Sequence, residues 1–326
     1  MIDSHPLRSV LAPDLGRYIA LKRSLGRQFE TGAYCLSRLD RFLASSQATD
    51  LTRENFLAWV AELRHLKAYG RWSWMRIVYN FCVFRRRSAP TCFVPDPTHF
   101  PTPQQRACPY ILTTQEIARI LSETNALKAH RNSPLFPQVA RIAIVLLYTT
   151  GMRRGELVKL TLGDYDNVER TLLVRETKFY KSRMLPLSDD AVVELEKYLV
   201  CRRRTGFPVH RDAPLLINAS PRIRGYTGAG LGMLVRALYR RAEVFRPDGR
   251  PPRVHDLRFS FVAHALLRWY NAGINVQAKL PALSAYLGHV SVASTQYYLT
   301  FLDSVGQAAC DRFDQHCSQF LKGVHQ

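Results

Sequence analysis

Residues 255–267 read HDLRFSFVAHALL, and residues 286–299 read YLGHVSVASTQYYL. In the first stretch His255 and Arg258 are three residues apart, so a helix there places the imidazole and the guanidinium on one face. The second stretch contains a further histidine and ends close to a pair of tyrosines. The two stretches gather polar groups that can bind and attack an anion, and the rest of the chain is interpreted around them.

Arginine suits a phosphodiester under attack, because its planar fork donates two parallel hydrogen bonds and stays charged at neutral pH. Arg153, in the upstream segment TGMRR at 150–154, adds a second guanidinium to that of Arg258. Lys178 follows a predicted strand and can protonate a leaving oxygen. The phenol of Tyr298 has an ordinary pKa of ~10, so it needs cationic neighbours to become a nucleophile.

Each of these residues also has an ordinary structural explanation. A histidine and an arginine three residues apart are commonly a surface pair, and a lysine in a turn is commonly solvated. Tyr298 is explained by packing, and His289, which follows Leu287 and Gly288, by helix capping or a place in the core. Only the combination of these residues and their order favour a catalytic site.

This combination resembles the tyrosine recombinases, the superfamily of phage integrases and Xer recombinases. The resemblance is carried by TGMRRGELVKLTLGDYD at 150–166, TKFYKSRMLPL at 177–187, HDLRFSFVAHALL at 255–267 and YLGHVSVASTQYYL at 286–299. It covers roughly residues 111–326, the catalytic domain. The N-terminal segment is similar to the core-binding domain of the family in size, charge and helicity.

The resemblance implies a role for each residue that would surround the phosphate. Arg153 and Arg258 would bind the scissile phosphate. His255 and His289 would assist proton transfer and phosphate binding. Glu156, three residues after Arg153, would be the structural acid that orients the active-site helix.

The resemblance also implies the covalent step. Lys178, rather than Lys181, would protonate the leaving 5′ oxygen, and Tyr298 would attack to give a 3′-phosphotyrosyl link, with Tyr297 as its neighbour. Family members exchange strands pairwise through a four-way junction, as a tetramer on double-stranded DNA, without metal or ATP. We therefore expect a homo-oligomer, no cofactor and no metal, and companion recombinases are a further expectation.

One segment departs from the compact members of the family. Within the segment 268–285, residues 268–280 resemble an insertion of about two helical turns, a feature of a subgroup associated with transposons and plasmids. After Tyr298, residues 303–321 are expected to form a terminal helix that packs on a neighbouring protomer or on its own chain.

The composition supports a polyanionic partner. The chain has 326 residues, 46 Lys and Arg against 26 Asp and Glu, and a net charge of +20 that both halves share. Nucleic acid is the leading partner for such a surface, ahead of an anionic membrane. The seven cysteines include no C-x-x-C pair, so reduced thiols in the cytoplasm and no zinc site are expected. With nucleic acid as the partner, the protein is expected to be nucleoid-associated. No signal peptide and no membrane-spanning segment are visible, so no membrane partner is expected.

The hydrophobic pattern predicts a mainly α protein with a small β-hairpin or sheet, in two parts. Residues 1–92 are expected to form a helical DNA-binding domain of about four helices, residues 93–110 a proline-rich linker, and residues 111–326 the catalytic domain. Basic side chains lie between the apolar positions of the first part and would meet phosphates or solvent: Arg23, Arg27, Arg38, Arg41, Arg71 and Arg76.

The catalytic part is expected to contain several well-marked elements. A capped helix starts near Thr113, apolar residues predict a helix over 136–149, and a short helix is expected over 153–160. Strands over 171–175 and 183–187 would form a hairpin, and a helix would run from 189 to 204. A loop rich in Gly and Arg is expected over 220–230.

Three other functions compete with a site-specific recombinase. A type IB topoisomerase shares the chemistry but relaxes DNA alone, and strand exchange between two sites would separate the two. A DNA-binding regulator that has lost catalysis is disfavoured by the filled catalytic positions. A metal-dependent nuclease is disfavoured because no carboxylate cluster accompanies His255, His264 or His289.

Overall fold

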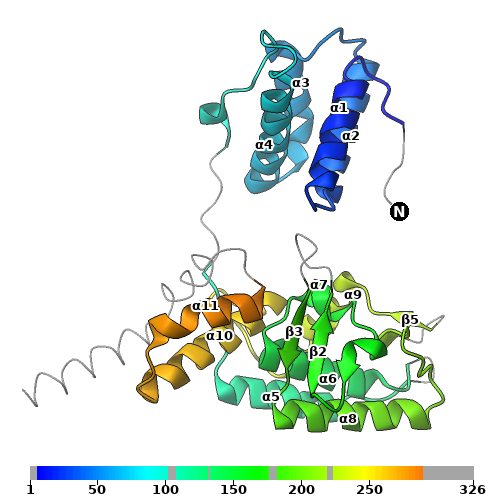
Figure 1. The fold of residues 1–326 in the computed structure, drawn as a ribbon, viewed down its shortest axis with the longest axis vertical. Helices are drawn as coiled ribbons and strands as arrows, with labels where there is room; N and C mark the ends of the chain where they lie inside the picture. Colours follow the sequence, from blue (N-terminus) through cyan, green and yellow to red (C-terminus); the bar gives the residue numbers. More distant parts are fainter. Residues whose placement is uncertain (1–5, 102–107, 131–132, 176–181, 219–222, 289–326) are drawn as a thin grey trace, which may run out of the picture. The chain divides into compact units, whose positions relative to one another are not determined.

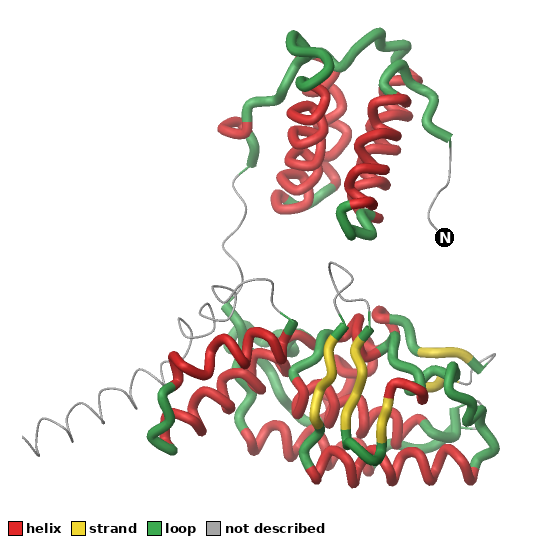
Figure 2. Tube along the Cα trace, in the orientation of Figure 1, coloured by secondary structure: helices red, strands yellow, loops and turns green. Residues whose placement is uncertain are grey.

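The computed structural model describes residues 6–101, 108–130, 133–175, 182–218 and 223–288. The chain divides into two compact units, residues 1–107 and 108–326, which are described separately. Figures 1 and 2 show that helices dominate both units and that, among the described residues, the strands all belong to the second unit. The mainly α fold with a small β component, predicted from the hydrophobic pattern, is therefore confirmed.

Over its described residues, 6–101, the first unit is a bundle of four α-helices. They are α1 (Ala12–Ser24), α2 (Glu30–Ser45), α3 (Arg53–Glu62) and α4 (Ala68–Arg85), with short 3₁₀ turns η1 (Leu63–His65) and η2 (Pro97–His99). Packing of α2 against α1, α3 and α4 builds one core, in which Leu36, Trp59 and Phe81 are buried. Thr52 caps α3 by accepting a hydrogen bond from the Asn55 backbone N–H at 3.3 Å.

Part of the expected linker packs onto this bundle. Phe100 is buried in its core, and Phe93 and Val94 pack against that core. Beyond the unit boundary, Leu112 is fully buried in the second unit, and its N–H donates to the Ser260 hydroxyl at 2.8 Å. Apolar side chains thus tie both ends of the proline-rich segment to a folded unit.

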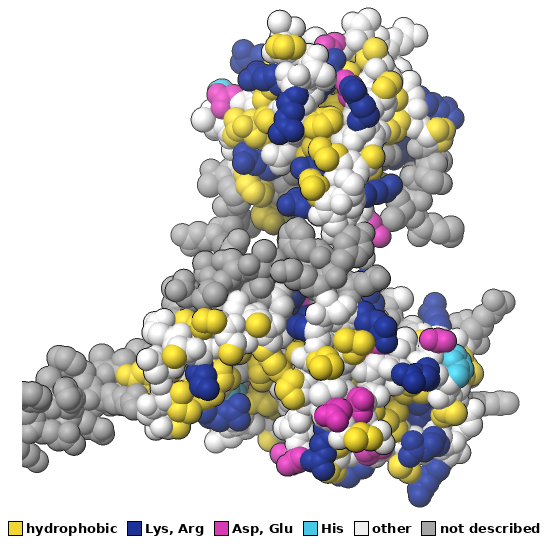
Figure 3. All heavy atoms as spheres, viewed as in Figure 1, with side chains coloured by type: hydrophobic (Ala, Val, Ile, Leu, Met, Phe, Trp, Pro, Cys, Tyr) yellow, Lys and Arg dark blue, Asp and Glu magenta, His cyan; other side chains and the backbone are white. Residues whose placement is uncertain are grey.

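The basic residues of the first unit are spread over its surface. Arg23, Arg27, Arg38 and Arg76 are exposed, whereas Arg41 is half-buried. Figure 3 shows Lys and Arg side chains scattered over the visible surface of both units. The positive charge of the sequence is therefore displayed by each unit rather than by a single tail.

The second unit is built around α6 (Phe136–Thr150). This helix packs against α5 (Thr114–Asn125), α7 (Arg154–Leu157), α8 (Asp189–Arg204), α9 (Gly228–Arg241) and α10 (Val254–Asn271). It is apolar on nearly every face, which is why it becomes the buried centre of the unit. Thr113 and Glu116 cap α5 reciprocally, with the Thr113 N–H donating to the Glu116 carboxylate at 2.7 Å.

A three-stranded antiparallel sheet covers part of this core. Its strands are β1 (Tyr165–Asp166), β2 (Thr171–Val174) and β3 (Arg183–Pro186), with Leu172 paired to Leu185. Both leucines are buried, whereas Met184, the residue before Leu185 in β3, is exposed. The expected hairpin is confirmed, and β1 is an addition that the pattern did not reveal.

The end of the described chain forms a second apolar cluster. Helix α11 (Val276–Leu287) packs against α10, and Leu266, Leu280 and Leu283 are buried between them. The segment 268–285 therefore contributes the last turn of α10, a connecting turn and most of α11.

The expected loop over 220–230 is only partly a loop. Strand β5 (Arg224–Gly225) pairs with β4 (Ile217–Asn218), and α9 already begins at Gly228. Thr227 starts that helix, because its hydroxyl accepts the Gly230 N–H at 3.0 Å. Residues 219–222 lie outside the described part of the chain.

Candidate active site

The site is assembled where the end of α6 meets α10. Gly151 closes α6 in the left-handed conformation, with φ of 61°, and its carbonyl accepts a hydrogen bond from Arg258 Nη1 at 2.8 Å. A Cβ on Gly151 would lie 2.5 Å from the ring of Phe261 on α10. The absent side chain lets the two helices approach until Arg258 can reach the turn.

Arg258 is almost completely buried, with 1% of its surface exposed. Its Nη2 donates to the Leu287 carbonyl at 2.8 Å, while Nη1 holds Gly151. One guanidinium therefore ties the C-terminus of α11 to the start of the segment that carries Arg153. Both arginines expected to bind phosphate are brought into one place, although 105 positions separate them in the sequence.

Arg153 lies in an extended conformation immediately before α7. Its Nη1 donates to Glu156 Oε1 at 2.8 Å, and its backbone N–H donates to Glu156 Oε2 at 2.8 Å. Its Nη2 makes a longer contact of 3.4 Å to the Gly288 carbonyl. The Arg153 side chain remains 37% exposed, so it can still meet a ligand from solvent.

Glu156 is the shared acceptor of the site. Arg183 Nη2 donates to Oε2 at 2.8 Å and Nη1 to Oε1 at 3.3 Å, so two arginines face one carboxylate. Burial alone raises the pKa of Glu156, but the hydrogen bonds from Arg183 and Arg153 outweigh it and leave the pKa below its ordinary value. Glu156 is thus an anion that orders the arginines around it.

Arg183 is a residue of the site that the sequence did not reveal as one. It starts β3, its side chain is only 11% exposed, and its Nε donates to the Tyr286 carbonyl at 2.8 Å. The strand alternation contains a signal for it: Leu185, two residues later, faces the core, so Arg183 lies on the same inward face. A charged residue on that face requires a buried partner.

Three arginines from three elements therefore hold three successive carbonyls at the end of α11. Arg183 binds Tyr286, Arg258 binds Leu287, and Arg153 contacts Gly288. The last carbonyls of a helix have no partner within the helix and carry its partial negative charge, so cationic donors stabilise them. We call this arrangement the arginine clamp.

His255 lies one turn before Arg258 on α10. Although the residue is exposed overall, its ring packs edge to face against Phe259, with centroids 5.3 Å apart. Desolvation of the ring, and then the charge of Arg258, lower the pKa of His255 to about 4. The free protein therefore carries a neutral His255 at neutral pH, and the ring is a weaker base there than a free imidazole.

This protonation state can be measured by titrating the histidine signals in NMR, with His255→Gln for assignment. We expect His255 to titrate well below pH 6.5, because its surroundings are apolar and cationic. Because the pKa of His255 is lower in the folded than in the unfolded protein, the fold favours the neutral ring. The stabilisation of the folded protein by this residue is therefore complete above pH 6.5, the unfolded pKa, and is lost as the pH falls towards 4. A signal titrating at 6.5 or above would contradict the described environment.

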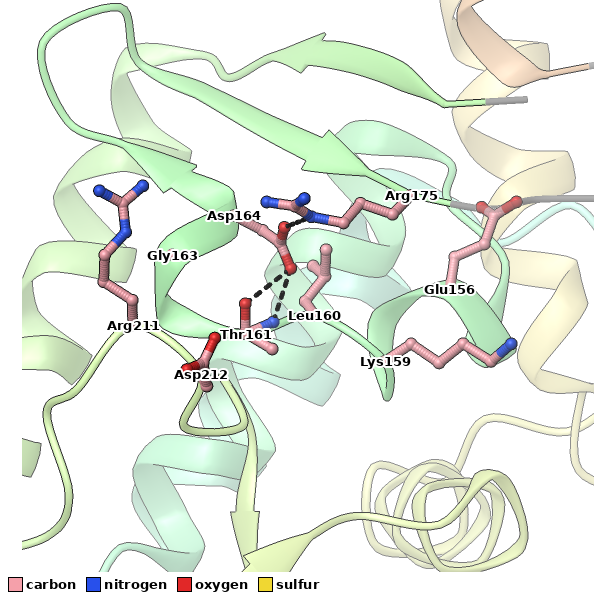
Figure 4. A pocket seen from close by; sticks show the side chains of 9 residues that line it. All are labelled: Glu156, Lys159, Leu160, Thr161, Gly163, Asp164, Arg175, Arg211 and Asp212. Carbon is pink, nitrogen blue, oxygen red and sulfur yellow. Dashed lines mark hydrogen bonds and ion pairs between the residues drawn. The ribbon is translucent and has the colours of Figure 1, made fainter. Parts of the chain in front are cut away.

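A cleft of about 560 Å³ adjoins Glu156 (Figure 4). Lys159, Arg175 and Arg211 line it together with Asp164 and Asp212. The Asp164 carboxylate accepts hydrogen bonds from Arg175, the Thr161 N–H and the Thr161 hydroxyl, the last two at 2.9 Å. Burial raises the pKa of Asp164, but these bonds prevail and lower it, so the carboxylate holds the Arg175 side chain in place at the cleft.

Three of the six expected catalytic residues belong to the described chain, and they converge: Arg153, His255 and Arg258. Lys178, His289 and Tyr298 lie outside the described residues. Within the described residues, no group of three or more His, Cys, Asp or Glu is placed to hold a metal ion. No helix among those residues is long and apolar enough to cross a membrane.

Comparison with known proteins identifies the family of the chain. The sequence signature described as the Phage integrase family matches residues 111–304. The chain is 30% identical over 303 residues to the integrase/recombinase y4rB of Sinorhizobium fredii, covering 91% of this chain and 95% of that protein. It is 30% identical over 190 residues to the tyrosine recombinase XerC 2 of Ralstonia nicotianae, covering 58% of this chain and 48% of that protein.

The fold has a counterpart among solved structures. The Tn1549 transposon integrase, solved in complex with transposon right end DNA, matches with a TM-score of 0.61 and 18% identity. The match covers 89% of this chain and 94% of that one. At this level of identity the likeness concerns the fold.

Proposed function

Because this chain belongs to the Phage integrase family and is a tyrosine recombinase, a DNA strand-transferase, we propose its reaction in detail. The proposal is site-specific cleavage and rejoining of double-stranded DNA through a 3′-phosphotyrosyl intermediate, during integration, excision or transposition of a mobile element. The observation that carries it is the convergence of Arg153 and Arg258 at the end of α11, with His255 one helical turn before Arg258 and under the charge of both arginines. The end of α11 comes directly before the segment of the sequence that contains Tyr298.

In the proposed reaction, Arg153 and Arg258 bind the nonbridging oxygens of the scissile phosphate, where negative charge grows during attack. The Tyr298 oxygen forms a bond to phosphorus as the bond to the 5′ oxygen breaks. Lys178 gives its proton to that 5′ oxygen, and His255, neutral in the free protein, is available to accept the tyrosine proton. Rejoining is the reverse with the 5′ hydroxyl of the partner strand, so the phosphodiester energy is conserved in the link.

The assembly follows from the same proposal. Two duplexes and four active sites are needed for paired strand exchange through a four-way junction, so the working form would be a DNA-bound tetramer. Companion recombinases, and a cytoplasmic location on the nucleoid, belong to the same proposal. By analogy with the Tn1549 integrase and its transposon-end DNA, the ends of the host element are the first DNA to test.

A nicked suicide substrate in EDTA tests the function. The substrate carries the ends of the host element and a nick close to the cleavage site. After cleavage, the short fragment that bears the freed 5′ hydroxyl diffuses away, so rejoining cannot occur and the covalent intermediate is trapped. We expect wild-type protein to give a covalent protein–DNA band in EDTA, because the proposed groups need no metal. Binding without any band would contradict the proposed chemistry, and loss of the band in EDTA alone would contradict its metal independence. Exchange of strands between two sites would then separate recombination from relaxation.

The salt dependence of duplex binding tests the grip on DNA. Each neutralised phosphate contributes about −0.9 to the slope of log K against log salt. Lys159 is exposed at the mouth of the Glu156 cleft, so Lys159→Gln should make that slope less steep by about one unit.

Lys197→Gln is the matched control for that measurement. Lys197 is an exposed lysine on α8 that pairs with Glu194 and does not line the cleft. Its substitution should leave the slope unchanged. Equal slopes for all three proteins would show that Lys159 makes no phosphate contact.

A further inference from the structure

Arg183 has a set of contacts that differs from those of the other two arginines of the clamp. All three of its guanidinium nitrogens have protein acceptors: Nε has the Tyr286 carbonyl, and Nη1 and Nη2 have the two oxygens of Glu156. Its side chain is 11% exposed, against 37% for Arg153. Arg183 is therefore committed to the protein, whereas Arg153 keeps a solvent-facing side.

The net charge of Arg153, Glu156 and Arg183 determines how strongly Arg153 can attract a phosphate. A pair of Arg153 and Glu156 alone would be neutral, and the buried carboxylate would oppose the binding of a second anion beside it. With Arg183 on the same carboxylate, the three side chains carry one net positive charge. Arg183 supplies the counter-charge of Glu156, and the charge of Arg153 remains effective towards a ligand.

The geometry adds a second effect. Through Nε, Arg183 joins β3 to the end of α11 while its other two nitrogens hold Glu156, at the end of α7. Gly288 closes α11 with φ of 65°, and a Cβ there would lie 2.8 Å from Arg183 Nη1. The backbone of α11 thus ends against the flat face of this guanidinium, one residue before His289 in the sequence.

We propose that Arg183 is a positioning residue for the strand-transfer reaction, which neutralises Glu156 so that Arg153 can bind the scissile phosphate, and which fixes the end of α11. This inference rests on the proposed function. It assigns no contact between Arg183 and DNA, because the proposed role acts through Glu156 and through the end of α11.

The test is a double-mutant cycle in the suicide-substrate assay, read as the single-turnover rate of adduct formation. Arg183→Met should lower this rate by about 10- to 100-fold, with little change in duplex affinity, because a transition-state charge interaction is weakened. Adding Glu156→Gln removes the uncompensated carboxylate. The double variant should therefore recover at least about 10-fold of the lost rate, which a merely structural role would not produce.

Arg141→Met is the matched control. Arg141 also binds a glutamate, Glu194, and a backbone carbonyl, that of Leu121, but on α6 away from the clamp. The Arg141→Met variant should be less stable than wild type but should form the covalent adduct at the wild-type rate. If Arg183→Met does not fold, Arg183→Lys replaces it, and the retained charge should preserve most of the rate. A Lys variant slowed by the about 10- to 100-fold expected for Arg183→Met would overturn the proposal.

The outcomes separate the two proposals. No adduct with wild-type protein that binds the DNA would overturn the proposed function and, with it, this inference. An adduct with wild type, together with an equal rate for Arg183→Met, would overturn the role of Arg183 alone. A slow Arg183→Met that Glu156→Gln does not rescue would do the same, because the charge argument requires the rescue.

Discussion

Tyr298→Phe is expected to form no covalent adduct with a suicide substrate while binding the same duplex as tightly as wild type. The substitution removes one oxygen, the only atom of Tyr298 that can bond to phosphorus, and leaves the ring. Because the covalent route then has no nucleophile, the band should vanish rather than weaken. This is the largest effect that any single substitution in the chain should have on the reaction.

Tyr297→Phe is its natural control, since the neighbouring residue offers the same phenol one position earlier. It should retain the covalent band. If adducts persisted in Tyr298→Phe and vanished in Tyr297→Phe, the nucleophile would be Tyr297. Filter binding or gel shift on the uncut duplex measures affinity separately from the chemistry.

Arg258→Lys should lower the rate of adduct formation by about 10²- to 10³-fold, the usual cost of removing a preorganised donor from a transition state. Lysine keeps the positive charge but has no planar fork. It cannot hold the Gly151 and Leu287 carbonyls in two directions and still present a bidentate edge to a phosphate. The effect should appear in the cleavage rate, whereas duplex affinity, which sums many contacts, should change little.

Arg202→Lys provides a matched control for this prediction. Arg202 is also fully buried in the second unit, and it donates to the backbone carbonyls of Pro208, Pro214 and Leu215. Both variants should unfold at a lower temperature, because buried carbonyls lose donors. Only Arg258→Lys should lose cleavage. Equal cleavage by the two variants would mean that Arg258 is a structural residue.

Most of the elements could be predicted from local sequence patterns. The helix expected over 189–204 is α8, from Asp189 to Arg204, and the helix expected over 136–149 ends one residue later, at Thr150. Ser188 caps α8 through the Ala191 N–H, and apolar spacing defines α6. Caps and periodicity act within a few residues, so the sequence displays them directly.

The local patterns were less informative where elements are short. The helix expected over 153–160 is one turn, α7, because the chain then turns at η3 (Leu162–Asp164), where Thr161 and Asp164 bond each other. Strands β1, β4 and β5 have two residues each, too few for any alternation. Their pairing depends on which partner strand lies alongside.

By itself, the sequence determined the chemical groups of the site, their order and the family. It did so because Arg153, His255, Arg258 and the residues around Tyr298 stand in short, recognisable segments, and the family was confirmed by comparison. The roles of Lys178, His289 and Tyr298 remain predictions for the experiments above.

Only the tertiary structure decided how those groups are held. The arginine clamp on Tyr286, Leu287 and Gly288, and the sharing of Glu156 by Arg153 and Arg183, join segments up to 135 residues apart. Such contacts arise from burial: a guanidinium enclosed between α10, β3 and the end of α11 must find acceptors there, and the nearest are backbone carbonyls and one carboxylate. No local pattern encodes which carbonyl that is, because its position follows from the packing of the whole unit.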